Sequence, residues 1–135
     1  MPNDLFPTPL TIREANMKNP LALAFVGDTV WDLLIRQRLL ESSARVNLLH
    51  RRAVALVNAG AQAEASLRIE PHLTPEEAEV LRRGQNAHAH HNVPKNQAPL
   101  AYSRSTGLEA LLGYLYLSGQ GERIIELFDI GVSIP

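Results

Sequence analysis

The sequence predicts an all-α fold, and three observations support this prediction. Apolar residues recur every three or four positions along most of the 135 residues, which is the period of a helix packed on one side. An Asn or Thr followed by Pro, a typical helix start, stands before two of these stretches. No stretch alternates apolar and polar residues in the way that a half-buried strand would.

The first two predicted helices occupy the N-terminal half of the chain. Asn19-Pro20 provides a cap followed by proline, and a helical apolar period continues from there to about Ser42. The next helix begins near Asn47. Gly60 weakens it locally, but the Ala-rich stretch that follows lets it continue to Leu67.

Three more helices and one long loop are expected in the second half. The segment Thr74–Glu77 combines a capping box with proline at the first helical position, and predicts a helix towards Gly84. Further helices are expected over about Ser103–Ser118 and Glu122–Val132. Gln85–Pro99 contains two X-Pro pairs that disfavour helix, and a loop of this length is usually functional or disordered.

Length and composition narrow the class of protein. We expect residues 1–135 to form a single domain, with residues 1–19 loosely structured apart from a short helix over Thr11–Met17. The absence of cysteine excludes disulfides, thiolate metal sites and cysteine nucleophiles. The sequence shows neither a signal peptide nor a stretch of about 18 apolar residues that could span a membrane. We therefore expect a cytoplasmic protein with no membrane partner.

The net charge of −1 conceals a segregation of charge along the chain. No acidic residue lies between Glu79 and Glu109, nor within Ser42–Ala63. These segments hold most of the basic residues and a histidine cluster: Arg82, Arg83, Lys95, Arg104, His88, His90 and His91 in the first, and Arg45, Arg51 and Arg52 in the second. A local basic surface suits phosphate binding, although two solvated faces would give the same pattern.

Three acidic residues lie in stretches that are otherwise apolar. Asp28 and Asp32 are four positions apart in one predicted helix, and Glu109 stands alone in another. Carboxylates in such surroundings need a partner. If the helices crossed at Ala24 and Gly113, each one turn from an acid, Asp28 and Glu109 could hold one ion. Oxygen ligands without cysteine favour Mg²⁺, with Mn²⁺ as a substitute.

Simpler interpretations exist for the same residues. Thr106 and Glu109 also fit a capping box at a helix start. Arg36, one turn beyond Asp32, could pair with the aspartates on a solvated helix face. Spacing alone leaves these alternatives open.

The cluster His88-x-His90-His91 raises the question of a zinc site. It lies in the predicted loop with no cysteine or nearby carboxylate to complete a tetrahedral set of ligands. A polar loop close to phosphates is the better interpretation.

Several motifs resemble one known family. A-L-A-F-V-G-D-T-V at residues 22–30 is similar to the signature helix of ribonuclease III catalytic domains, and S-T-G-L-E-A-L-L-G-Y-L-Y-L at 105–117 to their second acidic helix. L-R-R-G-Q-N-A at 81–87, P-K-N at 94–96 and Y-S-R-S-T at 102–106 resemble Mini-ribonuclease III, which consists of the catalytic domain without a double-stranded-RNA-binding domain. The resemblance covers about residues 19–117.

The resemblance implies a catalytic pair of acidic residues and fewer acidic residues around it than in the larger ribonuclease III enzymes. Asp28 matches the essential aspartate of the family, and Glu109 the essential glutamate; both would hold Mg²⁺. Three other acids of the larger ribonuclease III enzymes fall on Leu21, Ala24 and Thr106, as in other Mini-III members. Asp32 is a weaker candidate that could hold a metal-bound water from the outer shell.

The implied protein is an all-helical homodimer that cleaves both strands of double-stranded RNA and leaves 5′-phosphate and 3′-hydroxyl ends. Its substrate would be the precursor of 23S ribosomal RNA, free or bound by ribosomal proteins. The residues expected to contact the RNA are Arg82, Arg83, Asn86, Lys95, Asn96 and Arg104. The alternatives are a catalytically degenerate domain that binds RNA or protein, and a helical interaction module that binds no RNA. The presence of both Asp28 and Glu109 favours the enzyme.

Overall fold

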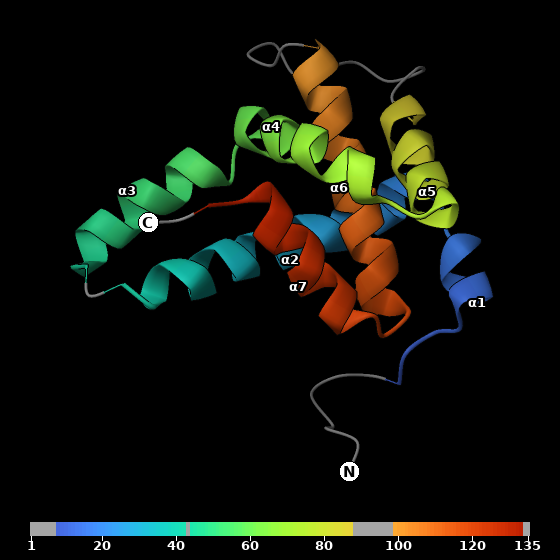
Figure 1. Cartoon of the computed structure of the whole chain (residues 1–135), viewed down its shortest axis with the longest axis horizontal. Helices are drawn as coiled ribbons and strands as arrows, with labels where there is room; N and C mark the ends of the chain where they lie inside the picture. Colours follow the sequence, from blue (N-terminus) through green and yellow to red (C-terminus); the bar gives the residue numbers. More distant parts are fainter. Residues whose placement is uncertain (1–7, 43, 88–98, 134–135) are drawn as a thin grey trace.

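The computed structural model describes residues 8–42, 44–87 and 99–133, and every regular element in these ranges is a helix (Figure 1). The elements are α1 (Ile12–Asn16), α2 (Pro20–Leu40), α3 (Val46–Leu56), α4 (Ala59–Ile69), a 3₁₀ turn (Glu70–His72), α5 (Pro75–Asn86), α6 (Pro99–Leu117) and α7 (Gly121–Gly131). The predicted all-α fold class is confirmed. Within these ranges, no helix is both long and apolar enough to cross a membrane.

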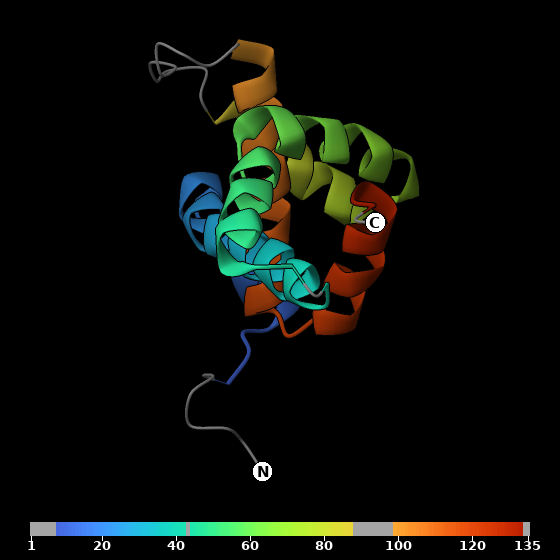
Figure 2. The ribbon, with the colours of Figure 1, turned by 90° about the vertical axis from the view of Figure 1, so that its left-hand side faces the viewer.

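Helix α6 is the centre of the fold. Helices α2, α4, α5 and α7 pack around it, and Figures 1 and 2 show it crossing α2 steeply. Every residue from Ser105 to Leu115 is buried except Glu109, which is partly buried. A helix that is apolar on all sides belongs in the core, so the one carboxylate in this segment stands out.

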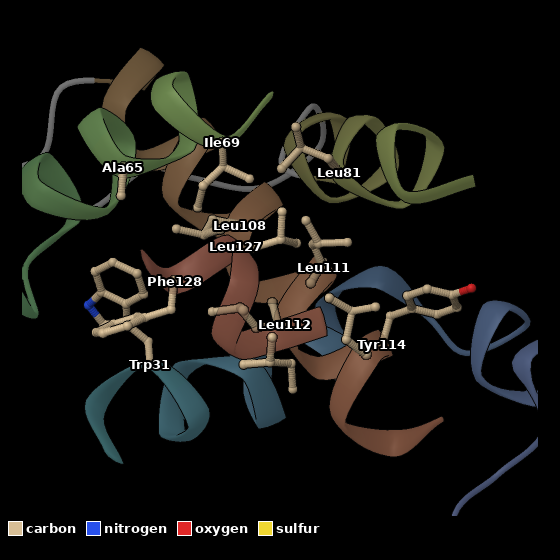
Figure 3. Packing of buried hydrophobic residues seen from close by; sticks show 14 of the residues in the cluster. Trp31, Ala65, Ile69, Leu81, Leu108, Leu111, Leu112, Tyr114, Leu127 and Phe128 are labelled. Carbon is tan, nitrogen blue, oxygen red and sulfur yellow. The ribbon is translucent and has the colours of Figure 1, made fainter. Parts of the chain in front are cut away.

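The rest of the core is built on apolar side chains from the surrounding helices (Figure 3). Trp31 of α2 meets Phe128 of α7 edge to face, with ring centroids 5.6 Å apart. The indole N–H of Trp31 donates to the carbonyl of Leu56 at the end of α3 (2.9 Å). These contacts hold α2 against both α3 and α7.

The predicted helix starts are confirmed where capping residues specify them. The side chain of Asn19 accepts a hydrogen bond from the Leu21 amide (2.8 Å) at the start of α2. Thr74 and Glu77 form the expected capping box of α5. The short helix predicted within Thr11–Met17 is present as α1.

The prediction of one continuous helix from Asn47 to Leu67 is wrong, because Asn58 interrupts it. The Asn58 side chain accepts a hydrogen bond from the Ala61 amide (2.9 Å) and so caps a new helix, α4. Side chains such as Asn offer the backbone an alternative to continued helix, and here that effect outweighs the favourable alanines. Gly60 lies in the first turn of α4 rather than inside a longer helix.

The predicted irregular stretch is shorter than expected at both ends. Gln85 and Asn86 are the last residues of α5, and α6 starts at Pro99. Proline is tolerated in the first turn of a helix because its missing N–H would have no intrahelical partner there. Residues 88–98 lie outside the described ranges.

Candidate active site

Two glycines allow α2 and α6 to cross with their backbones in contact. A Cβ at Gly27 would lie 1.7 Å from the carbonyl oxygen of Glu109, and a Cβ at Gly113 would lie 1.9 Å from that of Leu23. Any side chain at either position would force the helices apart. The predicted role of Gly113 is confirmed, but its counterpart on α2 is Gly27, and Ala24 is a neighbour that lines the adjoining hollow.

This crossing brings Asp28 and Glu109 together. Gly27 touches the backbone of Glu109, so the next residue, Asp28, stands beside the Glu109 side chain, and the two carboxyl groups interact by a hydrogen bond. They border a surface hollow of about 200 Å³, lined by Leu21, Ala24, Phe25, Asp28, Tyr102, Thr106 and Glu109. Asp28 is exposed and Glu109 is partly buried.

The environment of Glu109 disfavours its ionised form. Burial, followed by the hydrogen bond and the negative charge of Asp28, raises the pKa of Glu109 to about 8, against a smaller opposing effect of Gln62. Two carboxyl groups this close either share a proton or need a cation between them. Among the described residues, none forms an ion pair with either group.

Gln62 of α4 also reaches the Glu109 carboxylate. Its amide nitrogen lies 3.5 Å from a Glu109 oxygen, and the Ser105 hydroxyl donates to its amide oxygen. Neither Gln62 nor Ser105 was predicted from the sequence as a site residue. A signal was present, because Gln62 lies on the same helical stripe as the apolar residues Ala65 and Ile69, and a polar side chain there needs a partner.

Asp32 has a different partner from Asp28. Its carboxylate pairs with Arg36 one turn away (2.9 Å), both side chains are largely exposed, and Asp32 is not among the residues that line the hollow. The simpler interpretation of an ion pair on a helix face therefore holds for Asp32.

The capping-box interpretation of Thr106 and Glu109 is wrong. Helix α6 begins at Pro99, so Thr106 lies inside it, and its hydroxyl donates to the Tyr102 carbonyl (3.0 Å). Glu109 is therefore not needed to close a helix start.

The two arginines of α5 have different surroundings. Arg82 is exposed and pairs with Glu79 (Nε to Oε2, 3.0 Å). Arg83 donates to the backbone carbonyls of Asn16 (2.9 Å) and Lys18 (3.5 Å), which ties α5 to the connection between α1 and α2.

Two further candidate RNA contacts, Asn86 and Arg104, lie around the facing ends of α5 and α6. Asn86 is exposed and Arg104 is partly exposed. The Ser103 hydroxyl donates to the Gln85 carbonyl (2.8 Å) and joins the two helix ends. Lys95 and Asn96 lie outside the described residues, as does the histidine cluster His88, His90 and His91.

Comparison with known proteins decides between the alternatives. The Ribonuclease III domain family matches residues 21–120, which include the whole α2–α6 crossing. The chain belongs to the ribonuclease III family.

Its relatives place it in the Mini-ribonuclease 3 group. It is 50% identical over 111 residues to the Mini-ribonuclease 3 of Symbiobacterium thermophilum, covering 82% of this chain and 85% of that protein. It is 42% identical over 123 residues to that of Brevibacillus brevis, covering 90% and 91%. Protein FN1578 from Fusobacterium nucleatum has a similar solved structure, with a TM-score of 0.77 at 30% identity over 84% of this chain and 91% of that one. This ribonuclease III family member is thus an endoribonuclease.

Proposed function

We propose that this endoribonuclease cleaves both strands of double-stranded RNA in a Mg²⁺-dependent reaction at the hollow between α2 and α6. The observation that carries the proposal is the contact between Asp28 and Glu109 in an open hollow. We also propose precursor 23S ribosomal RNA as the biological substrate, because the chain resembles Mini-ribonuclease 3 proteins along most of its length.

The donor set fits Mg²⁺ or Mn²⁺. Two carboxylates are held together in a hollow of about 200 Å³ that is open to solvent. Such ions bind to one or two carboxylates and keep several waters. A divalent cation held there would supply a water of lowered pKa and would neutralise charge on the scissile phosphate. No third His, Asp or Glu joins a cluster with these two within the described residues.

The chain's own residues would bind and orient the reactants. Asp28 and Glu109 would fix the position of the cation, and the contact at Gly27 and Gly113 would keep the two carboxylates at a constant separation. Attack of water on phosphorus with departure of the 3′ oxygen leaves a 5′-phosphate and a 3′-hydroxyl. A degenerate domain would have no need to retain this carboxylate pair.

The RNA-binding surface would extend from the hollow over the ends of α5 and α6. Proteins recognise an A-form duplex mainly through its phosphates and 2′-hydroxyls. These groups would be contacted by Arg82, Asn86, Lys95, Asn96 and Arg104. Arg83 is engaged by backbone carbonyls, so its part would be to hold α5 in place.

A homodimer would account for the apolar residues on the surface of α2. Phe25 is 81% exposed and lines the hollow, and Leu40 is 69% exposed on the same helix. An apolar groove of about 440 Å³ lies between α2 and α3. Exposed apolar patches of this kind often mark protein interfaces. Two subunits, each with one site, would cut the two strands.

Cleavage of a long RNA duplex tests the proposal. The wild-type protein, Asp28→Asn and Glu109→Gln are each incubated with the duplex in Mg²⁺ or in EDTA, with Asp32→Asn as the matched control. We expect cleavage by the wild type and Asp32→Asn in Mg²⁺ only, and a loss of at least about a thousandfold for the other two. Cleavage in EDTA, or normal cleavage by Asp28→Asn, would contradict the proposed site.

Binding of the same duplex in EDTA tests the proposed surface. Replacing Arg82, Lys95 and Arg104 with Ala should weaken binding and reduce its salt dependence. Replacing Arg45, Arg51 and Arg52 removes the same charge from the α3 region and is the control. Equal losses in the two triple variants would show that total charge, and not this surface, determines the affinity.

A further inference from the structure

A chain of hydrogen bonds runs from the core to the carboxylate of Glu109. Ser105 is 4% exposed and donates its hydroxyl proton to the amide oxygen of Gln62. Gln62 is 2% exposed and directs its amide nitrogen to a Glu109 oxygen at 3.5 Å. Three side chains from α4 and α6 thus form one connected polar group that runs from the apolar core to the hollow.

The Glu109 carboxylate determines which group donates and which accepts in both of these hydrogen bonds. A carboxylate that binds a cation is ionised and only accepts hydrogen bonds, so in that state the Gln62 amide must turn an N–H towards Glu109. Its oxygen then faces Ser105, and the serine hydroxyl must donate. Removing the Ser105 hydroxyl would leave the Gln62 amide without the contact that fixes which end faces the carboxylate.

The position of Gln62 depends on the interruption between α3 and α4. The cap at Asn58 starts α4 at Ala59, and the new helix turns the stripe of Gln62, Ser66 and Ile69 into the core. A buried amide is costly unless it is hydrogen bonded. An apolar side chain at this position would avoid that cost, so core packing alone does not explain a glutamine.

We propose that Gln62 and Ser105 are positioning residues that hold the Glu109 carboxylate in the orientation required to bind the divalent cation. This inference rests on the proposed function. Gln62 fixes one side of the carboxylate from α4, while Asp28 stands beside it from α2. Ser105 acts only through Gln62, since its bond goes to the amide and not to the acid.

Binding of Mn²⁺ to the metal-free protein, followed by Mn²⁺ electron paramagnetic resonance without RNA, tests this inference. The variants are Gln62→Met, Ser105→Ala and the double variant. We expect Gln62→Met and Ser105→Ala each to weaken Mn²⁺ binding by about tenfold, as is typical when a partner behind a metal ligand is lost. The double variant should be no weaker than Gln62→Met, because both changes break one chain. In cleavage, kcat should fall while the KM for the duplex stays unchanged.

Ser66→Ala is the matched control. Ser66 lies one turn beyond Gln62 on the same helix and is 1% exposed. Among the described residues, its hydroxyl oxygen is the one buried side-chain polar atom without a hydrogen-bond partner. Its replacement should leave Mn²⁺ binding unchanged. If Ser66→Ala weakens binding as much as Ser105→Ala, or if folded Ser105→Ala binds like the wild type, the inference is overturned.

Glu109→Gln separates this inference from the proposed function. If Glu109→Gln loses Mn²⁺ binding while Ser105→Ala and Gln62→Met keep it, only the positioning role fails. If Glu109→Gln itself binds Mn²⁺ like the wild type, the proposed metal site fails. Additive losses in the double variant would also contradict the single chain of bonds.

Discussion

Glu77 is buried and Glu109 is partly buried, yet their pKa values shift in opposite directions from the ordinary value. Burial would raise the pKa of Glu77, but hydrogen bonds from Arg123 and Thr74 lower it instead. Its carboxylate receives two N–H groups of Arg123 at 2.9 and 2.8 Å. Glu109 faces another acid, and its pKa rises to about 8.

The difference lies in where the compensating charge comes from. Arg123 of α7 is part of the fold, so the charge of Glu77 is matched whenever the protein is folded. The described residues give Glu109 and Asp28 no cation, so the folded chain carries an electrostatic cost that a bound ion can relieve. The first arrangement stabilises the protein, and the second prepares it for a ligand.

The largest effect should come from separating Asp28 and Glu109 without changing either acid. Gly113→Ala places a Cβ where the Leu23 carbonyl stands, and we expect it to lower the free energy of unfolding by about 3 kcal/mol. It should also abolish Mg²⁺-dependent cleavage, because α2 and α6 must move apart. Urea unfolding followed by circular dichroism measures the first effect. Gly121→Ala, whose added Cβ would meet nothing within 4 Å, is the control and should change stability far less.

The next largest effect on stability should come from breaking the ion pair between Glu77 and Arg123. Glu77→Gln removes the buried one of the two carboxylates that pair with Arg123, and we expect a loss of about 2–3 kcal/mol, since Glu126 compensates only part of the Arg123 charge. Glu79→Gln, which breaks the exposed pair with Arg82 on the same helix, should change the free energy of unfolding far less, because solvent screens that pair. Equal losses in the two variants would mean that burial of Glu77 is unimportant.

Replacing Glu109 should raise the free energy of unfolding of the metal-free protein at pH 8, whereas replacing Glu77 lowers it. A raised pKa in the folded state gives stability that is present below the unfolded value of about 4.5 and is lost as the pH rises through about 8. The metal-free wild type should therefore lose stability over this interval, by about 2 kcal/mol because water in the open hollow screens the charges. Glu109→Gln should lack this dependence and should exceed the wild type in stability at pH 8. Urea titrations at several pH values in EDTA measure it, and a flat wild-type profile would contradict the raised pKa.

The smallest effect should be the response to Mg²⁺ itself. At pH 8, Mg²⁺ at about ten times its Kd should stabilise the wild type by about 1.4 kcal/mol. Glu77→Gln should respond equally, because its defect lies elsewhere, whereas Glu109→Gln should not respond. Thermal melts with and without Mg²⁺ make the comparison, and a response of Glu109→Gln would place the cation at another site.

Local signals made most helix starts predictable, although the local cap at Asn58 was missed. The contacts between helices depend on distant partners and could not be predicted in this way. Asn19 and Thr74 announce helix starts through bonds to residues two or three positions away, so the sequence is sufficient there. The contact of Gly27 with α6, in contrast, depends on which residue of α6 lies opposite it. The pattern on α2 alone suggested Ala24 as the point where the helices cross.

The candidate site divides in the same way. The family motifs and the small residues indicated that Asp28 and Glu109 would meet, and they do. The roles of Gln62 and Ser105 required α4 to start at Asn58, a boundary that the alanine-rich composition concealed. The bonds from Arg83 to the carbonyls of Asn16 and Lys18 were not predicted, because these residues lie far away in the chain.

Trp31 gives the enzyme a built-in spectroscopic probe. It is the only tryptophan of the chain, it is 2% exposed, and its ring and N–H contact α7 and α3 rather than the residues that line the hollow. Intrinsic fluorescence excited at the indole band should therefore shift to longer wavelength when α2 separates from these helices. Unfolding of every variant discussed above can be followed through this one emission without a label, and neither bound cation nor RNA needs to touch the fluorophore.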